Sequence, residues 1–334
     1  MAAHDKGSGI EKMRQTAPAN AAGKRFDAIV ALLFGDYSRS RLQDWIKRGL
    51  ITANGQQRKP SDKLIGGEAI ELLVPEDALA DGLLDEWDSG VPKVPAQPIP
   101  VERIYSDDHI FIVNKPAALV MHPAPGNRTG TLMNGLLSID EALRMVPRAG
   151  IVHRLDKDTS GLCVVARTLQ SHTALVSQLQ SRSMSREYLA IVLGELPNTG
   201  TIEEPIGRHP KDRKRMAVNH AGKYACTHYE VVERFEGCSL LAVKLDTGRT
   251  HQIRVHLTHL GHPLLGDPVY GRRSTSRPLW VQKDPLISQF ERQALHAFKL
   301  GLVHPDTGEA VQFEQAPPDD FAQLLQTLRD CYSV

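Results

Sequence analysis

Hydrophobic residues near the start of the chain recur at helical spacing. Phe26, Ile29, Val30 and Leu33 are three or four positions apart, which predicts an amphipathic helix. A second helix is predicted over residues 38–48, with a serine start, one apolar face and a glycine stop. These positions are Ser38, Leu42, Trp45, Ile46 and Gly49. The Asn54-Gly55 pair then predicts a tight hairpin, because both residues accept positive φ. We therefore expect residues 24–74 to form a small domain of two helices and a few strands.

From residue 101 onward, short runs rich in Val, Ile and Leu predict strands with few helices between them. The predicted strands are residues 109–114, 162–166, 188–193, 229–233, 240–245 and 297–303. The predicted helices are residues 170–180, 250–260 and 320–329. Because strands and helices do not alternate regularly, we expect residues 101–334 to form an α+β domain with a mixed, largely antiparallel sheet.

Acidic and basic residues are distributed unevenly along the chain, although their totals nearly cancel. There are 40 Lys+Arg and 39 Asp+Glu, a net charge of +1. Residues 75–100 hold five prolines and six acids against one base, so this segment is predicted to be an extended linker. The folded parts are correspondingly more basic than the total suggests. Residues 1–23 are polar and Ala-rich, and we expect a disordered tail there to which no role is assigned.

Several classes of protein lack support in the sequence. Residues 1–23 have no apolar core of a secretory signal, and no window approaches the ~18 apolar residues of a membrane span. No two of the four cysteines form a C-x-x-C pair, which fits neither a zinc framework nor a disulfide scaffold. We expect a cytoplasmic protein. P-loop, dinucleotide, G-x-S-x-G and zinc-deaminase motifs are absent, so we expect no nucleotide cofactor and no metal.

Residues 150–162 are the segment richest in chemistry. Asp156 lies among two cations, a second carboxylate and a histidine, between apolar runs. A carboxylate beside cations stays ionised and can act as nucleophile, as base or as a stabiliser of positive charge on a sugar. The alternative is a solvated turn whose charges face water.

A second charged segment spans residues 246–262. Thr250 is predicted to cap a helix, which would place Arg249 at an anion-attracting helix N-terminus. Its histidines suggest a metal site only weakly, since no H-E-x-x-H pattern and no nearby cysteine accompany them. They are His251, His256, His259 and His262. Tyr188 opens a predicted strand, where a lone tyrosine is usually a packing residue.

Two clusters of basic residues are candidates for contact with nucleic acid, since such clusters neutralise phosphates. The first occupies residues 207–216 and the second lies in the predicted second helix; for both, the alternative is a solvated charged surface. The first contains Arg208, Lys211, Arg213, Lys214 and Arg215. The second contains Arg39, Arg41, Lys47 and Arg48.

Long motifs in order resemble the RluA/RluD family of pseudouridine synthases. They are A-G-I-V-H-R-L-D-K-D-T-S-G at 149–161, N-K-P at 114–116, R-E-Y at 186–188, G-R-T-H-Q-I-R at 248–254, G-D-P-V-Y-G at 266–271 and Q-A-L-H-A at 293–297. The resemblance extends from residue 101 to the C-terminus and is strongest to the type that acts on large-subunit rRNA. Residues 24–74 resemble an S4 RNA-binding domain.

The resemblance implies a role for several residues. Asp156 matches the catalytic aspartate, Tyr188 the tyrosine that stacks on the target base and takes the C5 proton, and Arg249 the arginine that pairs with the aspartate. Arg154 matches the residue that enters the helix stack when the uridine flips out, and we group His153 with it as an RNA contact. The family needs no cofactor.

The resemblance also implies a substrate. We expect a monomer that acts on 23S rRNA, free or in a pre-ribosomal particle, in the stem-loop at the bridge between the ribosomal subunits. The alternatives are the same chemistry on transfer RNA or another rRNA loop, a non-catalytic RNA-binding assembly factor, and a metal-dependent hydrolase that uses the histidines of residues 251–262.

Overall fold

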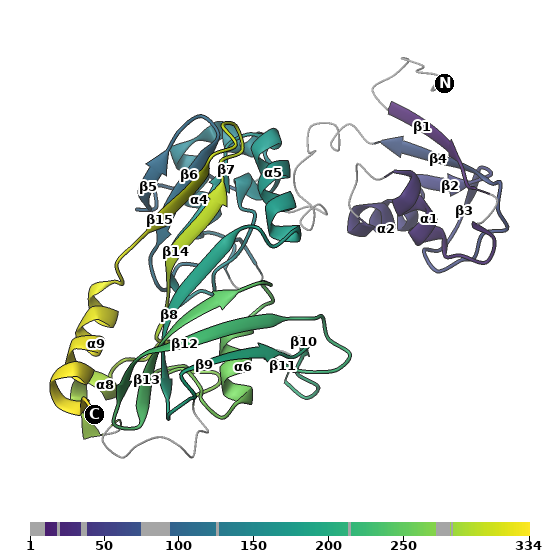
Figure 1. Ribbon diagram of the computed structural model, residues 1–334. Helices are drawn as coiled ribbons and strands as arrows, with labels where there is room; N and C mark the ends of the chain where they lie inside the picture. The colour runs from purple at the N-terminus through teal and green to yellow at the C-terminus, as the bar shows by residue number, and fades with distance from the viewer. Residues whose placement is uncertain are drawn as a thin grey trace. The chain divides into compact units, whose positions relative to one another are not determined.

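The computed structural model describes residues 11–18, 21–34, 39–74, 94–124, 127–212, 215–271, 281 and 283–334. The chain divides into two compact units, Met1–Lys93 and Val94–Val334 (Figure 1). In the described ranges, no helix combines the length and the apolar character that a membrane crossing requires.

The first unit contains two helices and a small antiparallel sheet, as the sequence predicts. The strands are β1 (Glu11–Thr16), β2 (Ile51–Ala53), β3 (Gln56–Gln57) and β4 (Ala69–Val74), in the order β1-β4-β2-β3. The helices are α1 (Phe26–Leu33) and α2 (Arg39–Lys47), and Phe26 and Trp45 are buried in the shared core. Gly49 follows α2 with φ +76°, and Asn54 and Gly55 both have positive φ in the predicted hairpin. The assignment to the S4 class stays a prediction.

Strand β1 corrects the expectation of a disordered tail over residues 1–23. Its six residues pair antiparallel with β4, and the following Ala17 and Ala21 are buried. The sequence of β1 has little hydrophobic periodicity, because a strand at a sheet edge can be held mainly by its backbone ladder. Residues 1–10 lie outside the described part of the chain.

The second unit is built on one mixed sheet in the order β5-β6-β7-β14-β8-β13-β12-β9, with β15 pairing β14. Only the contact between β7 and β14 is parallel, so the predicted α+β architecture with a largely antiparallel sheet is confirmed. A separate hairpin, β10-β11, adjoins it. The strands are β5 (Glu102–Ser106), β6 (Ile110–Lys115), β7 (Ser160–Ala166), β8 (Ser185–Leu193), β9 (Thr199–Glu203), β10 (Ile206–Arg208), β11 (Met216–Val218), β12 (Cys226–Phe235), β13 (Cys238–Leu245), β14 (Leu295–Val303) and β15 (Ala310–Glu314).

Helices cover this sheet at its two ends. Helix α5 lies beside β7 and β14, and α9 lies at the opposite end beside α8 and β12 (Figure 1). The helices are α4 (Leu132–Ile139), η2 (Glu141–Met145), η3 (Pro147–Gly150), α5 (Leu169–Gln180), α6 (Gln252–His259), α8 (Pro285–Ser288) and α9 (Asp319–Tyr332). The capping prediction for Thr250 is wrong: His251 is the N-cap of α6, in left-handed conformation and without a side-chain cap bond.

The predicted linker of residues 75–100 ends earlier than expected. Residues 94–100 pack against α4: Asn134 donates its side-chain amide to the Pro95 carbonyl at 2.8 Å, and Ile99 adjoins Gly135. The prolines therefore fix an extended segment against the second unit. Residues 75–93, with all six acids, lie outside the described part of the chain.

Candidate active site

Asp156 lies on the loop between η3 and β7, and its side chain is 15% exposed. Its Oδ2 accepts a hydrogen bond from Arg254 Nη1 at 3.1 Å. Arg254 comes from the first turn of α6, so the contact joins segments 98 residues apart. The loop carboxylate is thereby fixed in one direction by a buried cation.

Arg254 is itself held by a second carboxylate. It donates Nε to Asp267 Oδ2 at 2.7 Å and Nη2 to Asp267 Oδ1 at 2.9 Å, a bidentate pair with both side chains buried. Burial alone would lower the pKa of Arg254, but the bonds and charges of Asp267 and Asp156 outweigh it and raise that pKa. The guanidinium therefore stays charged and pre-aimed at Asp156.

The contact expected for Arg249 is not formed. Arg249 is exposed, and its Nε donates to the Tyr224 carbonyl at 3.1 Å while its backbone N–H donates to Gln252. Both arginines belong to the same G-R-T-H-Q-I-R motif. The left-handed turn at His251, between the two arginines, starts α6 so that Arg254, not Arg249, contacts Asp156. The pairing predicted for Arg249 is therefore wrong.

His251 and Tyr270 complete the surroundings of this ion pair. His251 Nε2 lies 4.0 Å from Asp156 Oδ1, and its Nδ1 lies 2.9 Å from the Tyr270 hydroxyl. Burial lowers the pKa of His251, so the ring is neutral at pH 7 and its approach to Asp156 is not an ion pair there. Arg254 and Arg215 each stack over the Tyr270 ring at 5.0 Å.

Tyr188 lies in the middle of β8 and is 6% exposed. Burial raises the pKa of its hydroxyl; the charge of Arg186 opposes this shift and the charge of Asp156 adds to it. Tyr188 is therefore a neutral phenol at pH 7.

The loop that carries Asp156 is supported from several strands. The fully buried Lys115 donates to the carbonyls of Pro116, Leu119 and Lys157 at 2.8–2.9 Å. Arg292 donates to the Asp158 carbonyl at 3.2 Å and holds Asp320 through two bonds. Further supports are the contacts of Gln293 with Thr159 and of His296 with Ser160. Such outer contacts keep a reacting group within a narrow range of positions.

Arg154 and His153, adjacent on this loop, have different environments. Arg154 is exposed and free to meet a ligand. His153 accepts the Val164 backbone N–H through Nε2 at 3.1 Å, and burial lowers its pKa to about 3. His153 therefore supports β7 as a neutral ring; the RNA contact expected of it stays a prediction.

The basic clusters are described only in part. Lys211 is exposed in the β10–β11 hairpin with Arg208, whereas Arg215 packs on Tyr270. Arg213 and Lys214 lie outside the described residues, as do the side chains of Arg39 and Arg41. Lys47 is exposed at the end of α2, and Arg48 pairs with Asp44 at 3.5 Å. Contact of both clusters with RNA stays a prediction.

Comparison with known proteins decides what this site belongs to. The family model described as RNA pseudouridylate synthase matches residues 109–259. The ribosomal large subunit pseudouridine synthase D of Xylella fastidiosa is 50% identical over 94% of this chain and 92% of its own. That of Pseudomonas aeruginosa is 49% identical over 93% and 94%. The chain belongs to the RluA/RluD family of pseudouridine synthases.

Solved structures agree with this membership. The human protein RNA pseudouridylate synthase domain containing 1 is 25% identical, with a TM-score of 0.51 over 72% of this chain and 99% of that one. A second human protein, domain containing 4, shares the fold with a TM-score of 0.55 at 23% identity. The family resemblance and the α+β fold are thus confirmed, and the chain is an isomerase.

Several residues of this pseudouridine synthase site were not predicted to act. Arg254 and Asp267 lie inside quoted motifs, G-R-T-H-Q-I-R and G-D-P-V-Y-G, but the residues alone do not show which charges pair. The histidines of residues 251–262 do not form a metal-binding group among the described residues. His256 bonds Thr227 and the Glu204 carbonyl, and His262 bonds the Leu193 carbonyl.

Proposed function

We propose that this protein isomerises specific uridines of large-subunit ribosomal RNA to pseudouridine, with Asp156 as the catalytic carboxylate. The names of relatives 44–50% identical to this chain support the substrate class. The observation that carries the catalytic assignment is the chain of charges from Asp156 through Arg254 to the buried Asp267.

The reaction breaks the bond between C1′ of the ribose and N1 of uracil and forms a bond between C1′ and C5. The C5 proton leaves and N1 gains a proton, so no oxidant, reductant or water is consumed. A carboxylate serves this reaction by attacking C1′ or the base, or by stabilising positive charge on the ribose. Arg254 would hold the Asp156 carboxylate in place without reorganising during the reaction.

Tyr188 is proposed to stack on the target uracil and to take part in removing the C5 proton. Because its hydroxyl is neutral, it can accept that proton only while passing its own to a second acceptor. Its position in β8, paired with both β13 and β14, fixes the ring. The isolated phenol is too weak a base for the role, so the proposed proton transfer is concerted.

RNA binding is proposed to begin at the basic surfaces and to end with extrusion of the uridine. Extrusion costs a few kcal/mol of lost stacking, which an inserted side chain recovers in part. The exposed Arg154 is suited to that insertion, because it lies two residues from Asp156. Lys211 and Arg208 of the β10–β11 hairpin, and Lys47 of α2, are proposed to contact phosphates.

Substrate details extend the proposal. We infer that the modified uridines lie in the stem-loop at the bridge between ribosomal subunits, that the enzyme acts as a monomer, and that it works in the cytoplasm. Support comes from the ribosomal large subunit that the names of the relatives print.

A pseudouridine map of ribosomal and transfer RNA from cells that lack this protein tests the proposal. Cells would be rescued with wild type or with Asp156→Asn, and the sites read by carbodiimide labelling and primer extension. We expect large-subunit sites to disappear and to return only with wild type. If pseudouridines disappeared only from transfer RNA, transfer RNA would be the substrate in place of ribosomal RNA. If every pseudouridine persisted, a non-catalytic assembly factor would be favoured.

A further inference from the structure

A group of metal-ligand side chains lies on one face of the sheet formed by β9, β12 and β13. Cys226 and His228 are two positions apart on β12, so they project to the same face. Asp246 follows β13 directly and donates its backbone N–H to the Cys226 carbonyl at 3.3 Å. On the other side, β9 places Glu203 opposite Cys226 and Thr201 opposite His228. Strand β12 and the end of β13 thus bring a thiol, an imidazole and a carboxylate close together, with β9 alongside.

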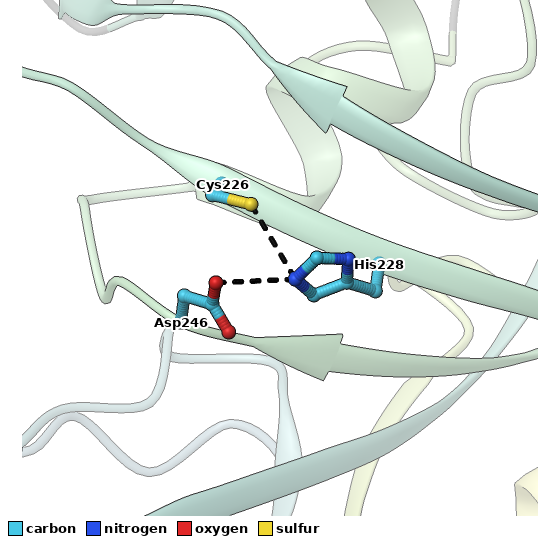
Figure 2. Close-up of side chains that lie close together, drawn as sticks. All are labelled: Cys226, His228 and Asp246. Carbon is cyan, nitrogen blue, oxygen red and sulfur yellow. Dashed lines mark hydrogen bonds and ion pairs between the residues drawn. The ribbon is translucent and has the colours of Figure 1, made fainter. Parts of the chain in front are cut away.

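The ligand atoms converge at the spacing of a small metal ion. His228 Nε2 lies 3.5 Å from Cys226 Sγ and 3.1 Å from Asp246 Oδ2 (Figure 2). Bonds of ~2.3 Å to sulfur and ~2.1 Å to nitrogen or oxygen in a tetrahedron require about 3.6 Å between S and N and about 3.4 Å between N and O. These two distances agree with the tetrahedral values to within about 0.3 Å, and all three ligand atoms lie within 4.8 Å of one another.

The arrangement does not suit a nucleophilic cysteine. In a Cys-His-Asp triad, one imidazole nitrogen faces the thiol and the other faces the carboxylate. Here Nε2 faces both, while Nδ1 lies 2.9 Å from Thr201 Oγ1. Burial, with a contribution from Asp246, raises the pKa of Cys226 to about 11, so the thiol is protonated and unreactive.

The outer contacts match those of a metal site. A metal-bound imidazole donates its other N–H to a fixed acceptor, and Thr201 Oγ1 is placed to accept from Nδ1. Glu203 Oε1, 3.8 Å from Cys226 Sγ, accepts from the Tyr224 hydroxyl; it lies outside the group of three and would bind the ion only after its exposed side chain moves. Thiolate, imidazole and carboxylate together favour Zn²⁺ over Mg²⁺ or Ca²⁺.

We propose that Cys226, His228 and Asp246 form a site for one Zn²⁺-type ion, whose fourth position is open to water or to Glu203 after its side chain moves. Binding displaces the thiol proton to solvent, and Nδ1–H replaces Nε2–H as the imidazole tautomer, so affinity falls as pH falls. Two neighbouring cations oppose binding: Arg182, whose charge acts on Asp246, and the exposed Lys244, which is opposite His228 in the sheet.

The ion would fasten the start of β12 to the segment that leads into α6. Thr247 accepts the Cys226 backbone N–H at 3.0 Å, and Gln252 donates to the Cys226 carbonyl at 2.9 Å. Gln252 is the first residue of α6, the helix that carries Arg254. Because the ion binds only the folded chain, it stabilises this junction in proportion to its free concentration.

Titration of the tag-free, metal-stripped full chain with Co²⁺ tests the proposal, followed by displacement with Zn²⁺. We expect one equivalent to bind, with a thiolate-to-cobalt absorption band and the visible bands of a tetrahedral ion. Cys226→Ser removes the thiolate band, and His228→Asn and Asp246→Asn each weaken binding at least tenfold. Cys331→Ser, which changes an exposed free cysteine, is the matched control and leaves binding unchanged.

Three outcomes would overturn the site: no stoichiometric binding, loss of the thiolate band in Cys331→Ser, or full affinity in both His228→Asn and Asp246→Asn. His228 and Asp246 are partly exposed, so these two variants remain informative where Cys226→Ser fails to fold. Since the readout is metal binding, the result is independent of the proposed isomerase activity.

Discussion

Replacing Arg254 by lysine keeps the positive charge and removes the geometry. The arginine makes three bonds at 2.7, 2.9 and 3.1 Å, and a single ammonium cannot reach both Asp267 and Asp156 as this fork does. With lysine held by the buried Asp267, Asp156 loses its cation. Loss of one preorganised electrostatic partner costs about 2.7–4 kcal/mol of transition-state stabilisation, so kcat should fall ~10²–10³-fold.

Measuring the stability of Arg254 variants shows whether this residue acts by positioning Asp156 or by stabilising the fold. Arg254→Met leaves the buried Asp267 without a counter-charge and should lower the free energy of unfolding by about 3–5 kcal/mol. Arg254→Lys retains a cation beside Asp267, so it should lower the free energy of unfolding by less than Arg254→Met does. The turnover that Arg254→Lys loses is then lost by an enzyme that is still folded. Circular dichroism melting and single-turnover release of tritium from RNA labelled at uracil C5 measure the two quantities.

Arg249→Lys is the matched control, since it lies in the same motif but bonds only a backbone carbonyl through its exposed side chain. Loss of one such hydrogen bond costs ~1 kcal/mol, or about fivefold in rate. Turnover that fell ~100-fold in Arg249→Lys and persisted in Arg254→Lys would refute the pairing described here and restore the sequence-based assignment.

Other predictions address the catalytic group, the fold and the linkage to pH. Asp156→Asn should leave RNA binding nearly intact in filter-binding assays while tritium release stops, because shape is kept and charge is lost; retained turnover would remove Asp156 from its role. Gly161→Ala should destabilise by at least about 3 kcal/mol, since its φ is +113° and a Cβ would lie 2.2 Å from the Ala297 carbonyl oxygen. Gly130→Ala, with φ +72° and open space around it, should cost only about 1–2 kcal/mol in the same urea titration; equal losses would contradict the argument. Burial lowers the pKa of Lys115 to about 8, so as pH rises the folded state releases this proton at a lower pH than the unfolded state does. The free energy of unfolding should therefore rise between pH 8 and 10.5. The Lys115→Met variant should lack this rise. Parallel curves of unfolding free energy against pH for the wild type and the variant would contradict the prediction. Deletion of residues 1–93 should leave residues 94–334 folded by calorimetry and weaken discrimination among RNAs, and loss of cooperative melting would count against that boundary.

The sequence was sufficient for the elements whose hydrophobic pattern is strong. All six strands and three helices predicted after residue 101 are present within a few residues, because their buried faces follow the expected periods. Strands β1, β5, β9, β10, β11 and β15 were missed, since they are short or polar and are held by backbone pairing with neighbours that the sequence does not identify.

The sequence predicted the carboxylate of the candidate site, Asp156, but it pointed to the wrong arginine as the partner of that carboxylate. Asp156 stands out through its motif, whereas the choice between Arg249 and Arg254 depends on one left-handed residue, His251, that sequence spacing cannot reveal. The supports from Lys115 and Arg292 were invisible for a similar reason. Each acts through a backbone carbonyl, and backbone carbonyls carry no sequence signal.

The supports of the Asp156 loop also constrain when the enzyme can become active. Arg292 bonds Asp158 across 134 residues, and β7 meets β14 in parallel at His296 and Ala297 only. Contacts of such long sequence separation form late, because a large loop must close first. A growing chain therefore has Asp156 long before it has the strand that orients it, and catalytic competence has to wait until β14 (Leu295–Val303) has been synthesised.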